Sequence, residues 1–115
     1  MLSLSNPCVY LHRRPVHMLK SFEGLSAIVQ REFPGQLDTG AYFVFLNKNR
    51  SMIKILFWDK DGFIIFYKRL EKGEFIVSSN GKTELSRREF LMLFEGIHPR
   101  QLNRRFVLKK HKNRV

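Results

Sequence analysis

The stretch MIKILFWDKDGFIIFYKRL, residues 52–70, decides the predicted fold. Two runs rich in Ile, Phe, Tyr and Trp flank Asp59-Lys60-Asp61-Gly62, and an Asp-Gly pair between two β-prone runs is typical of an antiparallel hairpin. Side chains alternate along a strand, so Ile53, Ile55 and Phe57 share one face and the residues between them share the other. Neither face is wholly polar. We therefore expect a sheet with one face packed on helices and a second face that is aromatic and basic.

Two segments outside the hairpin have the pattern of helices. Apolar residues at spacings of three and four predict an amphipathic helix from Pro15 to Phe33, ending before a Pro-Gly pair. A second helix is predicted from Ser86 to Glu95, because Ser86 and Glu89 have the spacing of a capping box, in which each side chain satisfies an amide of the first turn. We expect both helices to pack on the sheet.

Short β-prone runs supply the other strands. Cys8 to Leu11 is expected to add one strand, with Cys8 as a small core residue. Tyr42 to Leu46 and Phe75 to Val77 are predicted as the strands before and after the hairpin, and Thr83 to Leu85 as a short run pairing with the strand before it. The predicted fold class is α+β, with a small antiparallel meander sheet of four to five strands packed against two helices.

The charge of the chain is its unusual property. Its 115 residues include 21 Lys and Arg against 10 Asp and Glu, a formal charge of +11. We expect one domain over residues 1–98 and a flexible basic extension over residues 99–115. Such a charge favours nucleic acid, an acidic protein surface or an anionic membrane as partner. No apolar run is long enough to span a bilayer and the one cysteine excludes an internal disulfide, so we expect a cytoplasmic protein with no membrane contact.

Basic residues from several elements are expected to form a phosphate-contacting surface, because few acidic residues are available to neutralise them. The candidates are Arg50, Lys54, Lys68, Arg69, Arg87, Arg88, Arg100, Arg104, Arg105, Lys109 and Lys110. Trp58, Phe63 and Tyr67 are candidates for a contact with another protein. Core packing is the simpler interpretation of these aromatic residues, and stacking on unpaired bases is a further one.

The sequence offers little for catalysis. Asp59, Asp61 and Glu71 are the clustered carboxylates, and the first two flank a predicted turn, where Asp side chains commonly bond the nearby backbone. Neither a pair of histidines with ligand spacing nor a glycine-rich phosphate loop occurs. We therefore expect no metal, no cofactor and no enzymatic activity.

Three segments carry a resemblance to a known family. They are VYLHRRPVHMLKSFEGLSAIV, GAYFVFLNKNRSMIKILFWDKDGFIIFYKRLEKGEF and LSRREFLMLFEGI. Over residues 8–98 the chain resembles the TnpB-type, Orf2-like accessory protein of the insertion sequence 66 family of bacterial transposable elements. The part from Lys54 to Glu71 is the most specific. The resemblance implies a role in transposition beside a separate, larger transposase.

Four functional hypotheses remain open at this point. In the first, the protein is a non-enzymatic accessory factor that binds DNA electrostatically and docks on the transposase or a sister accessory protein. In the second, it is a pure protein adaptor whose charge complements an acidic transposase surface. The third is a metal-dependent nuclease subunit using Asp59, Asp61 and Glu71, and the fourth is an RNA-binding protein. The oligomeric state is left open.

Overall fold

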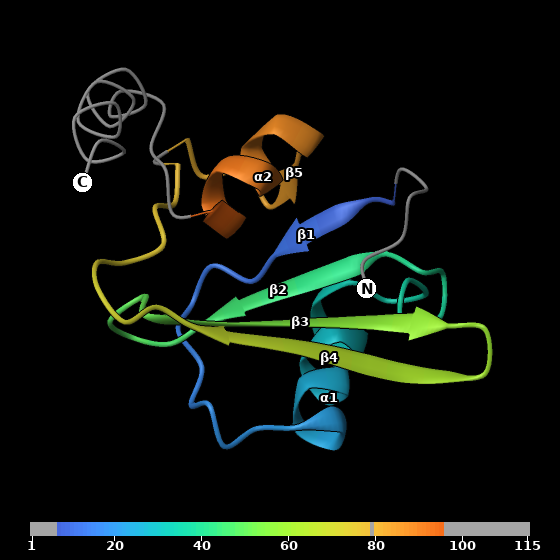
Figure 1. Ribbon diagram of the computed structural model, residues 1–115. Helices are drawn as coiled ribbons and strands as arrows, with labels where there is room; N and C mark the ends of the chain where they lie inside the picture. The colour runs from blue at the N-terminus through green and yellow to red at the C-terminus, as the bar shows by residue number, and fades with distance from the viewer. Residues whose placement is uncertain (1–6, 79, 96–115) are drawn as a thin grey trace.

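The computed structural model describes residues 7–78 and 80–95. Figure 1 shows the order of its helices and strands along the chain. They are β1 (Val9–Leu11), α1 (Phe22–Glu32), β2 (Tyr42–Leu46), β3 (Met52–Asp59), β4 (Gly62–Arg69), β5 (Glu84–Leu85) and α2 (Arg87–Glu95). No helix among these residues is both long and apolar enough to cross a membrane.

The strands form one mixed sheet in the order β4-β3-β2-β1-β5. β1 runs parallel to β2, and the other neighbours are antiparallel. An α+β fold with a largely antiparallel sheet of four to five strands and two helices is therefore confirmed. The predicted meander is correct only for β2, β3 and β4. The connection through α1 carries the chain back to the end of the sheet where β1 begins, so β2 runs parallel to β1.

The predicted hairpin is confirmed. β3 and β4 pair along their whole length from Met52 opposite Arg69 to Asp59 opposite Gly62. The two loop residues are Lys60 and Asp61, and Lys60 takes the left-handed conformation with φ of 56°. The glycine of the Asp-Gly pair therefore starts β4 and does not supply the positive φ of the turn.

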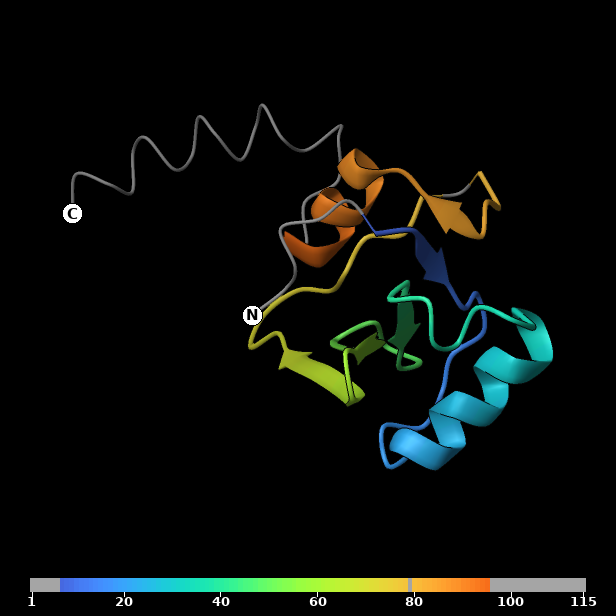
Figure 2. The ribbon, with the colours of Figure 1, turned by 90° about the vertical axis from the view of Figure 1, so that its right-hand side faces the viewer.

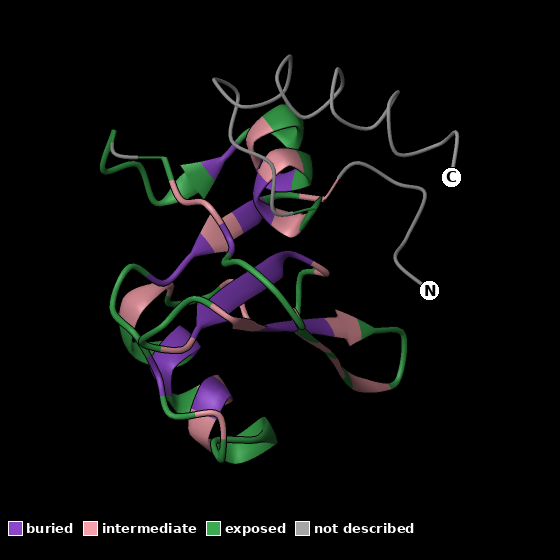
Figure 3. Cartoon of the chain, turned by 60° about the vertical axis from the view of Figure 1, so that its left-hand side comes forward, coloured by how far each residue is buried: buried purple, intermediate pink, exposed green. Residues whose placement is uncertain are grey.

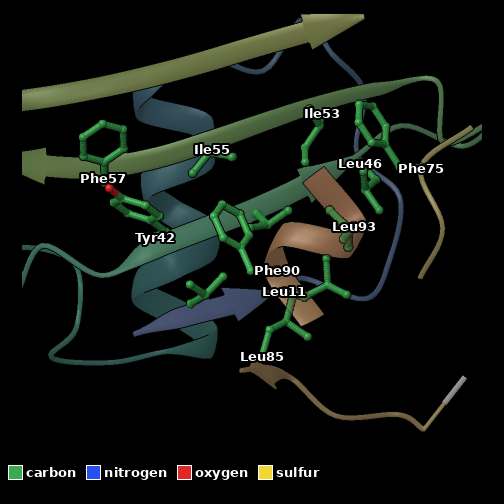
Figure 4. Packing of buried hydrophobic residues seen from close by; sticks show 12 residues of the cluster. Leu11, Tyr42, Leu46, Ile53, Ile55, Phe57, Phe75, Leu85, Phe90 and Leu93 are labelled. Atoms are coloured by element: carbon green, nitrogen blue, oxygen red, sulfur yellow. The ribbon is translucent and has the colours of Figure 1, made fainter. Parts of the chain in front are cut away.

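Helices cover both faces of the sheet, and the expectation of one open aromatic and basic face is wrong. α1 and α2 lie on opposite sides of the strands (Figure 2). On the α2 side, the alternate residues Ile53, Ile55 and Phe57 pack with Phe90 and Leu93 of the helix, as Figure 4 shows. The α1 side holds a second cluster of buried residues. It consists of Val16, Leu25, Ile28, Val29, Ala41, Phe43, Phe45 and Leu56.

The segment after β4 was predicted as a strand and is not one. The chain bends at residues 71–73, where Gly73 has φ of 79°, and then crosses the end of the sheet. Phe75 N–H donates to the Arg50 carbonyl at 2.7 Å, and the Phe75 ring is fully buried on the α2 side. The segment therefore fills the core with Phe75 and Val77 and does not add a strand beside β4.

The chain next forms β5, which pairs with β1 and not with the strand before it in sequence. The capping box of α2 is confirmed: Glu89 N–H donates to Ser86 Oγ at 3.1 Å, and Ser86 N–H donates to Glu89 Oε1 at 2.8 Å. The Ser86 N–H bond, with smaller contributions from Asn80 and Lys82, lowers the pKa of Glu89 although partial burial opposes the shift. The position of α2 is thus set from its first turn.

Two further predictions need correction. The first helix begins at Phe22 and not at Pro15, because Val16 N–H donates to the Leu46 carbonyl of β2 at 2.9 Å and residues 17–20 form a turn, in which Lys20 N–H donates to the His17 carbonyl. Cys8 is exposed and not a core residue, since it precedes the strand. Figure 3 shows that buried residues gather in the strands and exposed ones in the connections.

Candidate nucleic-acid interface

Two connecting segments, residues 12–16 and residues 47–51, lie side by side at the end of the sheet where β2 ends and β3 begins. Residues 12–16 leave β1 beside β2, held by the bond from His12 N–H to the Val44 carbonyl at 3.0 Å. Residues 47–51 turn from β2 into β3. Between them lies a cavity of about 180 Å³, and four cationic residues are among those that line it: Arg13, Arg14, Lys48 and Arg50. We call it the basic cavity. A neighbouring hollow of about 470 Å³ shares Pro15, Asn47 and Lys48 with it.

The turn that carries Lys48 and Arg50 is built by Asn47. Its Oδ1 accepts hydrogen bonds from Ser51 N–H at 2.9 Å and Met52 N–H at 3.0 Å, and its Nδ2 donates to Ser51 Oγ at 3.1 Å. Arg50 takes φ of 56° and donates its N–H to the Asn47 carbonyl. The backbone of both cationic residues is therefore fixed while their side chains stay exposed.

Arg13 ties the cavity wall to a distant loop. Its guanidinium donates to the Ser78 carbonyl at 2.9 Å, through Nε to the Lys82 carbonyl at 2.8 Å, and to Asn80 Oδ1 at 3.4 Å. All these acceptors are neutral, so the positive charge of Arg13 is not cancelled by them. Most of its N–H donors are used by these acceptors, so Arg13 contributes mainly its exposed positive charge to the cavity wall.

Arg14 shares a carboxylate with a buried histidine. Glu32 of α1 accepts from His12 Nδ1 at 2.7 Å and from Arg14 at 3.1 Å. Partial burial opposes ionisation of Glu32, but the hydrogen bonds and charges of His12 and Arg14 outweigh it and lower the pKa of Glu32. Neither Lys48 nor Arg50 has an ion pair with any described residue. The cavity wall therefore carries an excess of positive charge.

Lys54 does not belong to any exposed basic surface. It is only 7% exposed, and its Nζ donates to the carbonyls of Met18 at 2.8 Å and Lys20 at 2.7 Å. The ammonium also lies 4.7 Å from the ring centroid of Tyr67. Its charge is used inside the fold, where it holds the loop that leads into α1.

The other described candidates are spread over the molecule. The Lys68 ammonium lies 4.9 Å from the Phe94 ring centroid and 3.5 Å from the Phe94 carbonyl, at the end of α2. Arg69 is exposed and pairs with Glu71 at 3.4 Å. Arg87 and Arg88 are exposed in the first turn of α2. Only Arg50 of the predicted set lies in the basic cavity.

The remaining basic candidates fall outside the described residues. They are Arg100, Arg104, Arg105, Lys109 and Lys110. Their role as phosphate contacts stays a prediction.

The aromatic candidates divide between packing and exposure. Trp58 and Phe63 pair across β3 and β4 with their rings edge to face, 5.0 Å between centroids, and both are half-buried. Phe63 packs against the cluster under α1. Tyr67 is 52% exposed, although its hydroxyl lies 3.3 Å from Met52 Sδ. Tyr67 is thus the aromatic candidate that offers the most surface to a partner.

The sequence interpretation missed Arg13, Arg14 and Lys48 as site residues. Two signals were present: the pair Arg13-Arg14 directly after a β-prone run, and the basic turn from Asn47 to Ser51. What was lacking was the parallel pairing of β1 with β2, which brings the two segments together.

Comparison with known proteins identifies the family. The family model described as "IS66 Orf2 like protein" matches residues 8–104. The chain belongs to the IS66 Orf2-like family. A relative described as "Uncharacterized protein y4jC" of Sinorhizobium fredii (strain NBRC 101917 / NGR234) is 30% identical over 101 residues, or 86% of each chain. No solved structure matches the chain significantly.

Membership of the Orf2-like family supports a role as an accessory protein in transposition. The described part of this Orf2-like chain contains no group of three or more His, Cys, Asp or Glu side chains placed to hold a metal ion.

Proposed function

We propose that this protein is a non-enzymatic accessory factor that binds DNA in transposition, with the basic cavity as its phosphate-binding site, and that it docks on the transposase of its insertion sequence. The observation that carries the proposal is the convergence of Arg13, Arg14, Lys48 and Arg50 from two connections onto one cavity. A guanidinium and a nearby ammonium are the groups that hold phosphate oxygens most strongly.

The cavity contacts the DNA backbone and not the base edges. Its cationic groups lie on short connections at the end of the sheet, and neither described helix is preceded by the short turn and partner helix of a helix-turn-helix motif. Phosphate contacts set affinity and orientation without reading sequence. The selection of the element's ends therefore comes from the transposase, and the basic residues after residue 99 add electrostatic attraction.

The test is a binding titration with labelled duplex DNA over a series of salt concentrations. The double variant Lys48→Ala/Arg50→Gly removes two cationic groups of the cavity, and glycine suits the φ of 56° at position 50. Each lost phosphate contact lowers the salt slope by about one, so the slope should fall by about two and the affinity at low salt at least about tenfold.

A matched control separates the cavity from total charge. Arg31→Ala/Lys60→Gly also removes one Arg and one Lys, and Lys60 has the same φ of 56°. We expect its salt slope to stay close to that of the unaltered protein. Equal losses in the two double variants would contradict a specific role of the basic cavity. Metal-dependent DNA cleavage that Asp59→Ala abolishes would contradict the proposal that the protein is non-enzymatic.

The second candidate function is a protein adaptor that does not bind DNA. The exposed ring of Tyr67, on the same hairpin as the Trp58–Phe63 pair, favours it, because aromatic groups are enriched in protein interfaces. Co-purification with the transposase distinguishes the two. An adaptor loses its partner on Tyr67→Ser and shows no affinity for DNA, whereas the first proposal predicts DNA binding that Tyr67→Ser leaves unchanged.

A further inference from the structure

β4 forms one edge of the sheet and has no partner strand on its outer side among the described residues. It is eight residues long, whereas β5 on the opposite edge is two residues long. Figure 1 shows β4 running along the full outer border of the sheet. A long edge strand presents a row of backbone N–H and C=O groups to any strand that can pair with it.

The register identifies which backbone groups of β4 point outward. Leu70 N–H donates to the Ser51 carbonyl at 2.8 Å, which extends the ladder between β3 and β4. Bonded and non-bonded pairs alternate in an antiparallel ladder, so every second residue from Gly62 bonds to β3. The backbone groups of Phe63, Ile65 and Tyr67 therefore face away from the sheet.

The middle of this edge has no charged side chain that would oppose pairing with another strand. From Phe63 to Tyr67 the strand has no charged residue, and the Lys68 ammonium is directed to the Phe94 carbonyl and ring. Ile64 is 40% exposed and Tyr67 is 52% exposed. The charges flanking this stretch stand near the ends of the strand: Asp61 lies in the hairpin loop, and Arg69, the last residue of β4, is exposed and forms a surface ion pair with Glu71 at 3.4 Å.

We propose that β4 pairs with β4 of a second copy of this chain, antiparallel about a two-fold axis at Ile65. In this register Ile65 faces its own copy and Phe63 faces Tyr67 of the other chain, all through outward-pointing backbone groups. These residues make about six main-chain hydrogen bonds across the interface. Asp61 of each chain lies opposite Arg69 of the other, so opposite charges meet at both ends.

Charge favours this register over the one whose two-fold axis lies at Phe66. Moving the two-fold axis by one residue, to Phe66, would place Asp61 opposite Glu71 and Phe63 opposite Arg69. Like charges directly opposite each other on adjacent strands destabilise the pair. The edge shares no residue with the basic cavity, so dimerisation is independent of the proposed DNA binding.

The test measures the dimer dissociation constant of the full chain by sedimentation equilibrium. Asp61→Arg alone and Arg69→Asp alone each convert both attractive end contacts into repulsive ones, and each should weaken the dimer about tenfold. The double variant Asp61→Arg/Arg69→Asp should dimerise as the unaltered chain does. A mixture of the two single variants should also recover dimers, because each heterodimer then has two opposite-charge contacts.

The matched control is the pair Arg31→Asp and Asp38→Arg, which makes the same charge changes at exposed positions away from β4. These variants should leave the dissociation constant unchanged. A full chain that stays monomeric overturns the proposal. If the amides of Phe63, Ile65 and Tyr67 are protected from hydrogen exchange in that monomer, another segment of the same chain covers the edge. A dimer that responds equally to both sets of variants overturns it as well.

Discussion

The role of the Lys54 charge depends on residues that are near it in the fold and distant from it in the sequence. Alternation along β3 correctly predicts that it lies on the opposite face from Ile53 and Ile55. The pattern does not predict that the loop before α1 bends over it and presents two carbonyls to the ammonium. A buried cation needs such partners, so Lys54 contributes to stability and not to the exposed charge.

Lys54→Met keeps the apolar stem and removes the ammonium, which leaves the carbonyls of Met18 and Lys20 without their donor. We expect the free energy of unfolding to fall by about 2 kcal/mol, since hydrogen bonds to charged groups contribute roughly that amount. Urea denaturation measures it, with Lys72→Met as an exposed control. At a temperature where both variants are folded, DNA affinity should change equally little in the two. A selective loss of affinity in Lys54→Met would contradict the structural role.

Glu32 links stability to pH through His12 and Arg14. Its pKa is lower in the folded chain than the ordinary value of 4.5, so the folded chain binds fewer protons and the ionised carboxylate stabilises the fold above that pH. This contribution is lost as the pH falls through the lowered, folded-state pKa. Glu32→Gln should cost about 1–2 kcal/mol at neutral pH and flatten the decline in stability below about pH 4.5.

Urea denaturation over a pH series checks this, with Glu74→Gln as the exposed control. The control should keep the acid-dependent decline of the unaltered protein. If Glu32→Gln shows the same decline, the carboxylate at position 32 is not the group responsible.

At the level of elements, the structures that local chemistry decides were predictable. The hairpin over residues 52–70 depends on its turn residues and the β-prone runs directly beside them, and the capping box depends on Ser86 and Glu89, three residues apart. The start of α1 was not predictable, because the helical periodicity continues upstream of Phe22 into a segment in which Val16 bonds to β2 and residues 17–20 form a turn. Phe75 to Val77 has strand-like composition but serves as core filling on the α2 side.

Ser86→Ala removes the hydroxyl that accepts the Glu89 N–H and should destabilise the protein by about 1 kcal/mol. Ser86→Thr retains a hydroxyl at the same place and should recover most of the loss. Thermal and urea unfolding of the three proteins give the comparison. Equal destabilisation by Ala and Thr would mean that side-chain size at position 86, and not the cap, sets the position of α2.

At the scale of the whole molecule, the fold class was predictable and the strand order was not. Composition and alternation indicate an α+β domain, but the parallel pair of β1 and β2 joins segments about 30 residues apart and leaves no local pattern. The basic cavity depends on that pair. Sequence reasoning therefore found Arg50 on the turn and missed Arg13 and Arg14, which reach the same cavity only through the strand order.

The most direct test of the account is an amide NMR titration of the full chain with a short DNA duplex. The basic cavity predicts that shift changes concentrate at residues 12–16 and 47–51, and that they weaken together as salt is added. Changes confined to residues 99–115 would assign DNA binding to the extension alone. Changes centred on β4 and the hairpin loop, with none around Lys48 and Arg50, would contradict the cavity as the phosphate-binding site.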